Sequence, residues 1–343
     1  TNDMSLGPKW MLPWDTYLEL DQNDNVTITD YDGTQRYFEK NVPPSPAGYT
    51  SDIERDILED DGSDFYILTR YNGDKWYYDF TDLYLVKIVS RTEEELTITR
   101  DGNNRITAIE DSYGRIIEFF YITFNSITRL NEIREPAPGD VGFYSTFFQY
   151  DEDGRLIAIT SPIGEATRFV YDVNDRIEKA IDGHGHATTY TYDNDNRVTN
   201  IQDPALNNTV FTYSANQTTV TNRINEDTVY DFDNDGRVVK ITDALGNETE
   251  FVWDNTTWEL IQEFGPKIPV TGTPWSRHKN IYEYDTGSIA TQHDLIKKEV
   301  REVTNTDSTG TLLAEEEWSY NAQHDTLTHT DPLGHTTTYE YQL

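Results

Sequence analysis

An internal repeat constrains this chain more than any other feature of its sequence. Aromatic residues, most of them followed by Asp, recur along the chain at intervals of 21, 21, 21, 19, 21, 31, 36 and 21 residues. These anchor residues are Tyr150, Tyr171, Tyr192, Tyr213, Phe232, Trp253, Tyr284, Tyr320 and Tyr341. Upstream, Arg100 and Tyr121 fit the same frame. A period of this size indicates small supersecondary units that stack because they cannot bury their apolar faces alone.

Two further columns of residues recur with the anchors. A second aromatic residue stands two positions before each anchor from Tyr121 onward: Phe119, Phe148, Phe169, Tyr190, Phe211, Tyr230, Phe251, Tyr282, Trp318 and Tyr339. An arginine stands five positions after several anchors: Arg105, Arg155, Arg176, Arg197 and Arg237. Residues i and i+2 of a strand share a face, so paired rings are expected on one face, with like rings of neighbouring repeats in contact. The arginines are expected to bind turn carboxylates and carbonyls of a neighbouring hairpin.

Segments rich in Asp, Asn and Gly separate the strand-like runs and predict the tips of β-hairpins. The tips are expected at residues 151–154, 172–175, 193–196 and 233–236. A second set of turns is expected at residues 111–114, 161–164, 182–185, 243–246 and 331–334. Asx side chains cap such turns, and Gly accepts positive φ. The chain is therefore predicted to be all-β, with residues 51–60 as its single helix candidate.

The second strand of each hairpin alternates poorly between apolar and polar residues. Apolar residues occupy both Leu156 and Ile159, and again both Val238 and Ile241. A β-bulge and partial burial of both faces are two explanations that the sequence leaves open.

The repeated pattern resembles a known protein family. The segment FQYDEDGRLIAITSPIGEATRFVYDVNDRI is similar to the YD-repeat, or Rhs-repeat, family of large bacterial surface and toxin proteins, whose animal relatives are the teneurins. The resemblance covers residues 96–343, which we interpret as the repeat array. Residues 1–95, with Trp10, Trp14 and Tyr31-Asp32-Gly33, resemble the β-rich region that precedes the repeats and are expected to be continuous with them. Long insertions after Trp253 and Tyr284 leave the strand register there open.

The resemblance implies a fold and a function. Hairpins of this family join edge to edge into a long antiparallel sheet, which spirals into a hollow shell around a polypeptide cargo, often a C-terminal toxin. The chain would then be a piece of a longer polypeptide, forming an open arc or part of such a shell. Its expected function is that of a non-catalytic shell-wall fragment of a large secreted or surface-displayed bacterial protein. The expected partner is the rest of the same polypeptide, including the cargo, and the expected location is extracellular or at the bacterial cell surface.

The composition excludes some classes of function. The formal net charge is −35 from 27 Lys and Arg against 62 Asp and Glu, and such a surface repels nucleic acids and anionic membranes. No apolar run approaches the roughly 20 residues of a transmembrane helix. The chain has 0 Cys, so disulfides and thiol chemistry are excluded, although the redox compartment stays open.

Two segments resemble metal-binding motifs. Asp231, Asp233 and Asp235 precede Gly236 in the manner of a Ca²⁺ loop, but Thr242 stands where a bidentate Glu would be expected. Hairpin turns are the preferred interpretation of these aspartates, with weak Ca²⁺ binding as the alternative. His184 and His186 lie in a turn position and lack a third ligand at useful spacing, so a turn is again preferred.

We therefore predict no catalytic residue, no cofactor and no metal site. Two other functions remain as alternatives. The first is a carbohydrate- or protein-binding adhesion module that uses exposed aromatic rings. The second is an enzyme on a β-propeller, because two 21-residue units approach the length of a four-stranded blade.

Overall fold

The computed structural model describes residues 6, 10–41, 48–50, 56–70, 72–137, 139, 142–270, 273–285, 294–321 and 325–341. The chain divides into two compact units, Thr1–Thr188 (unit 1) and Thr189–Leu343 (unit 2). The described residues form strands, turns and bends and contain no helix, so the all-β prediction is confirmed. Accordingly, no helix in these ranges is long and apolar enough to cross a membrane.

Sixteen strands belong to unit 1 alone. They are β1 (Tyr17–Leu20), β2 (Val26–Thr29), β3 (Gln35–Lys40), β4 (Tyr49–Thr50), β5 (Ile57–Asp60), β6 (Phe65–Thr69), β7 (Lys75–Asp79), β8 (Leu85–Val89), β9 (Glu95–Arg100), β10 (Ile106–Asp111), β11 (Ile116–Phe124), β12 (Ile127–Pro136), β13 (Phe143–Tyr150), β14 (Leu156–Thr160), β15 (Ala166–Tyr171) and β16 (Ile177–Ile181). Strand β17 (Ala187–Tyr192) contains the division between the units.

Thirteen further strands belong to unit 2. They are β18 (Val198–Gln202), β19 (Asn208–Ser214), β20 (Gln217–Thr221), β21 (Asp227–Phe232), β22 (Val238–Thr242), β23 (Glu248–Trp253), β24 (Leu260–Phe264), β25 (Ile268–Val270), β26 (Thr273–Tyr284), β27 (Leu295–Thr304), β28 (Thr311–Tyr320), β29 (Thr326–Thr330) and β30 (Thr336–Thr338).

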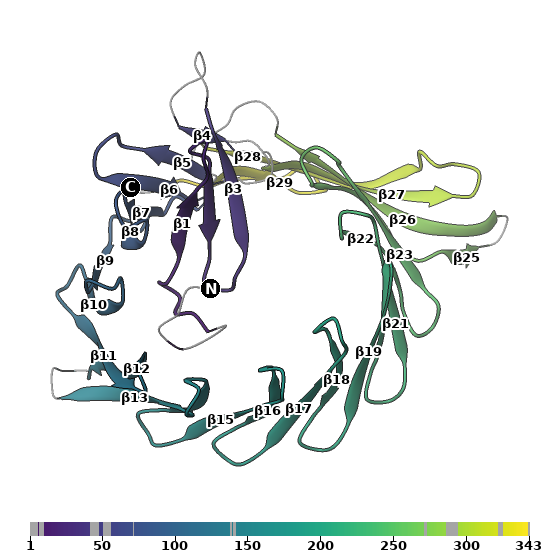
Figure 1. Ribbon diagram of the computed structural model, residues 1–343. Coiled ribbons are helices and arrows are strands. Elements are labelled where there is room, and N and C mark those ends of the chain that lie inside the picture. Colours follow the sequence, from purple (N-terminus) through teal and green to yellow (C-terminus); the bar gives the residue numbers. More distant parts are fainter. Residues whose placement is uncertain are drawn as a thin grey trace. The chain divides into compact units, whose positions relative to one another are not determined.

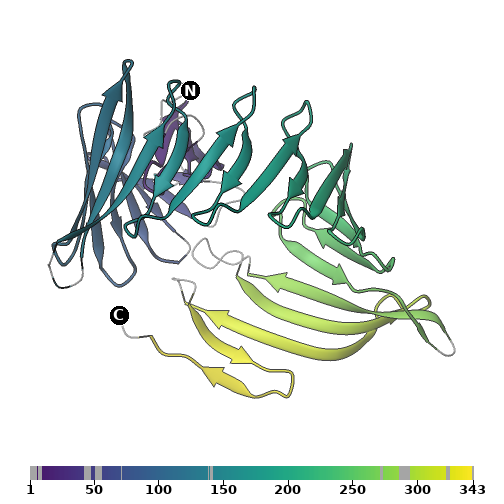
Figure 2. The same ribbon diagram turned by 90° about the horizontal axis from the view of Figure 1, so that it is seen from below.

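The strands form a meander in which sequence neighbours pair antiparallel. In unit 1 every strand from β1 to β16 pairs with the next (Figure 1). In unit 2 the pairing runs from β18 to β24, passes to β26 and continues to β30, with β25 paired to β26 (Figure 2). A β-propeller would interrupt this ladder after every four strands. The propeller hypothesis is therefore wrong.

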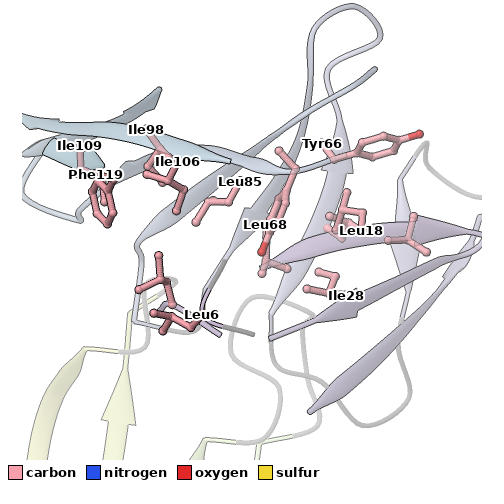
Figure 3. Close-up of a cluster of buried hydrophobic side chains, with 14 of the residues drawn as sticks. Leu6, Leu18, Ile28, Tyr66, Leu68, Leu85, Ile98, Ile106, Ile109 and Phe119 are labelled. Atoms are coloured by element: carbon pink, nitrogen blue, oxygen red, sulfur yellow. The ribbon is translucent and has the colours of Figure 1, made fainter. Parts of the chain in front are cut away.

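The first eight strands of unit 1 enclose a buried core. Strand β1 returns to the start of β8, because Leu18 N–H donates to the Leu83 carbonyl at 2.8 Å and Tyr17 forms a bridge with Tyr84. Among the side chains between them, Ile28 and Leu68 are 0% exposed. Figure 3 shows Leu18, Ile28 and Leu68 close together, with Ile98, Ile106 and Ile109 further along the sheet. The N-terminal part of the chain is thus β-rich, as the sequence predicts.

The helix expected at residues 51–60 is wrong where the structure describes it. Residues 57–60 form β5, and Leu58 pairs with Leu68 of β6 and is fully buried. Long-range pairing of this apolar side chain overrides the weak local helix signal. Residues 51–55 lie outside the described ranges.

The four predicted hairpin tips are confirmed, and the poor alternation of the second strands is explained by a β-bulge. In the hairpin of β13 and β14, Tyr150 pairs with Leu156 but Gln149 pairs with Ala158, so Ile157 is the extra residue. The same shift recurs in the hairpins β15–β16, β17–β18 and β21–β22. A bulge places the residues on either side of it, here Leu156 and Ile159, on the same face of the sheet.

Candidate functional site: the anchor face of the repeats

The turn that follows most anchors is built by one aspartate, as the turn after Tyr150 shows. Asp151 Oδ1 accepts hydrogen bonds from the backbone N–H groups of Asp153 and Arg155, and its Oδ2 accepts from Arg155 Nε at 2.7 Å. Gly154 closes the turn at a φ of +77°, and Arg129 from β12 packs against it and donates to its carbonyl. A residue in this left-handed conformation after a type I turn is the usual form of a three-residue hairpin loop.

The same aspartate and arginine pair recurs along the chain. The pairs are Asp101 with Arg105, Asp111 with Arg115, Asp172 with Arg176, Asp193 with Arg197, and Asp233 with Arg237. Burial acts to raise the pKa of Asp101, Asp172 and Asp233, but hydrogen bonds outweigh it, and the pKa of all five aspartates is lowered. At Asp193 the largest cause of the lowered pKa is the hydrogen bond from the backbone N–H of Arg197. The carboxylates are therefore held in their charged form by the turns they build.

The side chains of most anchors reach back to the preceding hairpin. The Tyr171 hydroxyl donates a hydrogen bond of 2.7 Å to the carbonyl of Leu156, the residue that pairs with the previous anchor, Tyr150. A bulge disrupts the ladder locally, so a backbone carbonyl beside it requires a donor from elsewhere. We call this contact the anchor latch.

The anchor latch recurs at eight further positions. The donor and acceptor residues are Arg100 and Leu85, Tyr121 and Ile106, Tyr150 and Leu130, Tyr213 and Val198, Trp253 and Val238, Tyr284 and Leu260, Tyr320 and Leu295, and Tyr341 and Thr326. In every case the acceptor pairs with the previous anchor, or with Tyr78 in the first. The latch is present after both long insertions, at Tyr284 and at Tyr320. The strand register that the sequence leaves open there is therefore the same as in the other repeats.

Phe232 is the anchor without a polar atom, and the hairpin before it differs in construction. Strands β19 and β20 pair without a register shift, from Tyr213 opposite Thr218 to Ser214 opposite Gln217. Thr218 also stands where the arginine column would place an arginine. A hairpin without this bulge presents no disrupted carbonyl, and the following anchor lacks the donor that would bind one.

Three of the arginines also contact the anchor of the following repeat. The guanidinium carbons of Arg105, Arg155 and Arg197 lie 5.2, 5.2 and 4.5 Å from the ring centres of Tyr121, Tyr171 and Tyr213. The expectation that like rings of neighbouring repeats would meet is corrected at these three anchors, because a guanidinium covers the ring. The expected role of the arginines is supported: Arg155 Nη1 binds Asp175 of the next hairpin at 2.6 Å.

A segment near the N-terminus covers this anchor face in unit 1. We call residues 10–16 the strap. The Trp10 ring lies 5.0 Å from Phe169 and its Nε1 donates to the Tyr171 hydroxyl at 3.2 Å, while Trp14 packs edge-on against Phe119 at 6.2 Å. Arg100 donates to the Trp14 carbonyl at 2.7 Å. Burial raises the pKa of the Asp15 carboxyl, and Arg100, 3.6 Å away, acts in the opposite direction.

Part of the anchor face in unit 1 is buried, whereas the equivalent rings in unit 2 are partly exposed, as Phe169 is in unit 1. Phe119 and Phe148, which stand two positions before their anchors, are 4% and 6% exposed. The equivalent Tyr190, Phe211 and Phe251 are all partly exposed. Burial also raises the pKa of the Tyr150 phenol in unit 1. The same repeat position therefore lies in two different environments.

The aspartates of the Ca²⁺-like motif form hydrogen bonds and ion pairs within the turn and the sheet. Asp233 accepts from the backbone of Asp235 and Arg237 and binds the Arg237 side chain, and Asp231 contacts Gln217 and Lys240 on the sheet. This geometry supports the turn interpretation. Within the described ranges, no three His, Asp or Glu side chains come together as a group that could hold a metal ion.

The two histidines also lie in a turn. His186 Nδ1 is 3.1 Å from Asp182 Oδ2, and the Asp182 Oδ1 accepts from the backbone of both His184 and His186. The position of His186 is that of Asn247 and His335 in other repeats, where each side chain contacts the first aspartate of its turn. Both histidines are exposed.

The repeat frame also continues upstream of its predicted start. Tyr78 pairs with Leu85 beside a bulge, and Leu85 is the acceptor of the Arg100 latch. The signal was present in the sequence, because Trp76, Tyr78 and Asp79 repeat the order of paired aromatics followed by Asp. The boundary proposed at residue 95 stays a prediction. The contacts of the strap, in contrast, cannot be predicted from the repeat pattern.

Comparisons with known proteins give one family match and several similar solved structures. The profile of the RHS repeat family matches residues 150–187. Similar solved structures include the TcdB2-TccC3 crystal structure, with 12% identity over 90% of this chain and 21% of that chain at a TM-score of 0.37. A Photorhabdus luminescens Tc holotoxin pore carrying a mutated TccC3 has 10% identity over 91% of this chain and 22% of that chain, at a TM-score of 0.39.

No curated protein matches the sequence. The chain spans about a fifth of the length of the solved chains it resembles. Residues 150–187 contain the hairpin β15–β16 with its flanking turns, anchor, latch and arginines. The chain therefore carries an RHS repeat, which confirms the resemblance to the RHS-repeat family.

Proposed function

We propose that this chain is a wall segment of a large secreted or surface-displayed bacterial protein whose sheet encloses or presents a C-terminal toxin cargo. The segment has no catalysis of its own. Its partner is the remainder of the same polypeptide, and its location is extracellular or at the bacterial surface. The net charge of −35 supports a partner other than nucleic acid or an anionic membrane.

The anchor latch is the observation that carries this proposal. Nine anchors use their polar atoms to hold the preceding hairpin, and the turn aspartates and arginines are bound to one another. Side chains that recur in most repeats are thus engaged in joining hairpins. A sheet built this way extends by adding identical joints, which is the property that a wall requires.

Adhesion through exposed aromatic rings is the second candidate. The half-exposed rings of Tyr190, Phe211 and Phe251 in unit 2 favour it, because a flat ring accessible to solvent can stack on a sugar or a partner side chain.

Denaturant titration and a glycan-binding screen of the same variant distinguish the two. In a wall, Tyr190→Ala lowers the free energy of unfolding by at least about 2 kcal/mol, and no glycan binds. The control is Val173→Ala at a turn position that is 98% exposed, which changes stability by less than about 0.5 kcal/mol. If Tyr190→Ala is as stable as the wild type but no longer binds a glycan that the wild type binds, the adhesion module is the correct function and the wall segment is wrong.

A further inference from the structure

The strap shows what kind of molecule the anchor face binds. It is a short stretch of polypeptide without helix or strand, and it contacts the face through two indole rings and one backbone carbonyl. The indole N–H of Trp10 is accepted by the hydroxyl of Tyr171, which at the same time donates to Leu156. A phenol oxygen has one donor and two acceptor sites, so the latch and the indole contact are compatible.

Unit 2 repeats the spacing of the surface that the strap covers. Phe119 on β11 and Phe169 on β15 are four strands apart in the meander, with Phe148 between them on β13. Phe211 on β19 and Phe251 on β23 are also four strands apart, with Tyr230 between them on β21. At about 4.8 Å per strand each pair spans roughly 19 Å, a distance that two bulky side chains four residues apart can bridge.

The chemistry of the two surfaces also matches. Side chains that share the face of Phe211 and Phe251 by register are Val220, Tyr230, Ile241 and Thr249. Trp253, which stands beside Phe251, carries only a donor, so the acceptor lies at the other end of the pair: Tyr213, beside Phe211, donates to Val198 as Tyr171 donates to Leu156, and its oxygen can accept an indole N–H. A segment bound in this way runs in the direction opposite to the strap. The two surfaces differ in burial, because Phe119 and Phe148 are buried whereas the rings in unit 2 are partly exposed, as Phe169 is.

We propose that the anchor face of strands β19–β23 binds an extended, tryptophan-bearing segment of the cargo polypeptide. This inference rests on the proposed function for the identity of the occupant. The indole rings pack against Phe211 and Phe251, and an indole N–H donates to the Tyr213 hydroxyl. A polypeptide is favoured over a sugar because the contacts of the strap include a backbone carbonyl as well as aromatic rings.

The test uses a fluorescently labelled peptide with the sequence of residues 10–16 and the complete chain. Fluorescence anisotropy is expected to show saturable binding, weakened at least about tenfold by Phe211→Ala or Phe251→Ala. The matched controls, Val210→Ala and Val252→Ala, alter the neighbouring residues on the opposite face, which are 38% and 39% exposed, and leave binding unchanged. A peptide with Ala at both Trp positions is expected not to bind.

A second measurement keeps the test independent of variant folding. The peptide with a photoreactive benzophenone in place of one indole is cross-linked to the wild-type chain, and cross-links are expected within residues 208–253. Cross-links within residues 95–171 would mean that the peptide replaces the strap in unit 1, and would overturn the inference. No peptide binding, or an equal loss of peptide binding in Val210→Ala and Val252→Ala, would overturn it as well. If the inference fails but Tyr190→Ala is strongly destabilised, the proposed function as a wall segment still stands. If the wild type binds a glycan and Phe211→Ala does not, the proposed function fails as well.

Discussion

The Tyr171 hydroxyl donates a hydrogen bond to the Leu156 carbonyl, which lies 15 residues earlier beside the bulge of the preceding hairpin. This one contact explains why most anchors are aromatic and carry a polar atom. The ring covers the sheet, and the polar atom satisfies a carbonyl that the bulge removes from regular pairing. Trp253 and Arg100 make the same contact with different chemistry, which shows that the donor is the shared requirement.

Acid is expected to destabilise the fold through its turns. Hydrogen bonds from Arg197 lower the pKa of Asp193, and those from Asn247, chiefly its side-chain amide, lower that of Asp243. A carboxylate whose folded pKa lies below its unfolded value of about 3.9 stabilises the fold above that pH, and this contribution is lost as pH falls through the folded pKa.

The net charge of −35 complicates this measurement, because acid also relieves repulsion among carboxylates. Denaturant titrations between about pH 5 and pH 2 are therefore run in about 1 M salt, where the Debye length is about 3 Å. Stability is expected to decrease over this range, and less steeply in Asp193→Asn. Stability that is constant or rises on acidification would contradict the role assigned to the turn aspartates.

Calcium is expected to have no selective effect. The oxygens of Asp233 already accept three hydrogen bonds within the turn, so added Ca²⁺ acts by screening the negative charge. Melting curves in millimolar CaCl₂ and in MgCl₂ of equal ionic strength should shift alike. A saturable rise in melting temperature that is specific for Ca²⁺, and is lost when Asp233→Asn and Asp235→Asn are combined, would establish a site here.

The strap is expected to contribute substantially to the stability of unit 1. Trp14 packs on Phe119 and its carbonyl binds Arg100, so Trp14→Ala should lower the free energy of unfolding by about 2–3 kcal/mol, less than a fully buried Trp because its ring is half-buried. Tyr113→Ala, at a turn position 75% exposed, serves as control and should change it by under about 0.5 kcal/mol. Equal effects of the two substitutions would show that the strap is not an integral part of the fold.

The sequence predicts what depends on local chemistry and misses what depends on register. The tip at residues 151–154 is predictable because Asp151 and Gly154 specify that turn by themselves. The latch from Tyr171 to Leu156 is not, since it requires knowing that the bulge falls at Ile157 and that the repeats lie side by side.

The predicted partner of the Tyr171 ring is wrong for a related reason. The repeat pattern predicts that rings at equivalent strand positions meet, but the intervening turn brings Arg155 over Tyr171. The contact between Trp10 and Tyr171 joins residues 161 positions apart. This contact is not part of the repeat pattern, so the sequence alone does not predict it.

The free energies of unfolding of Tyr213→Phe and Phe232→Tyr test most directly whether the anchor latch joins the hairpins. Tyr213→Phe removes the donor to the Val198 carbonyl and is expected to lower stability by about 1–2 kcal/mol. Phe232→Tyr adds a hydroxyl after the hairpin β19–β20, which pairs without a register shift, and is expected to change stability by less than about 0.5 kcal/mol. An unchanged free energy of unfolding in Tyr213→Phe would contradict the role of the latch. An increase of about 1–2 kcal/mol in Phe232→Tyr would contradict it as well.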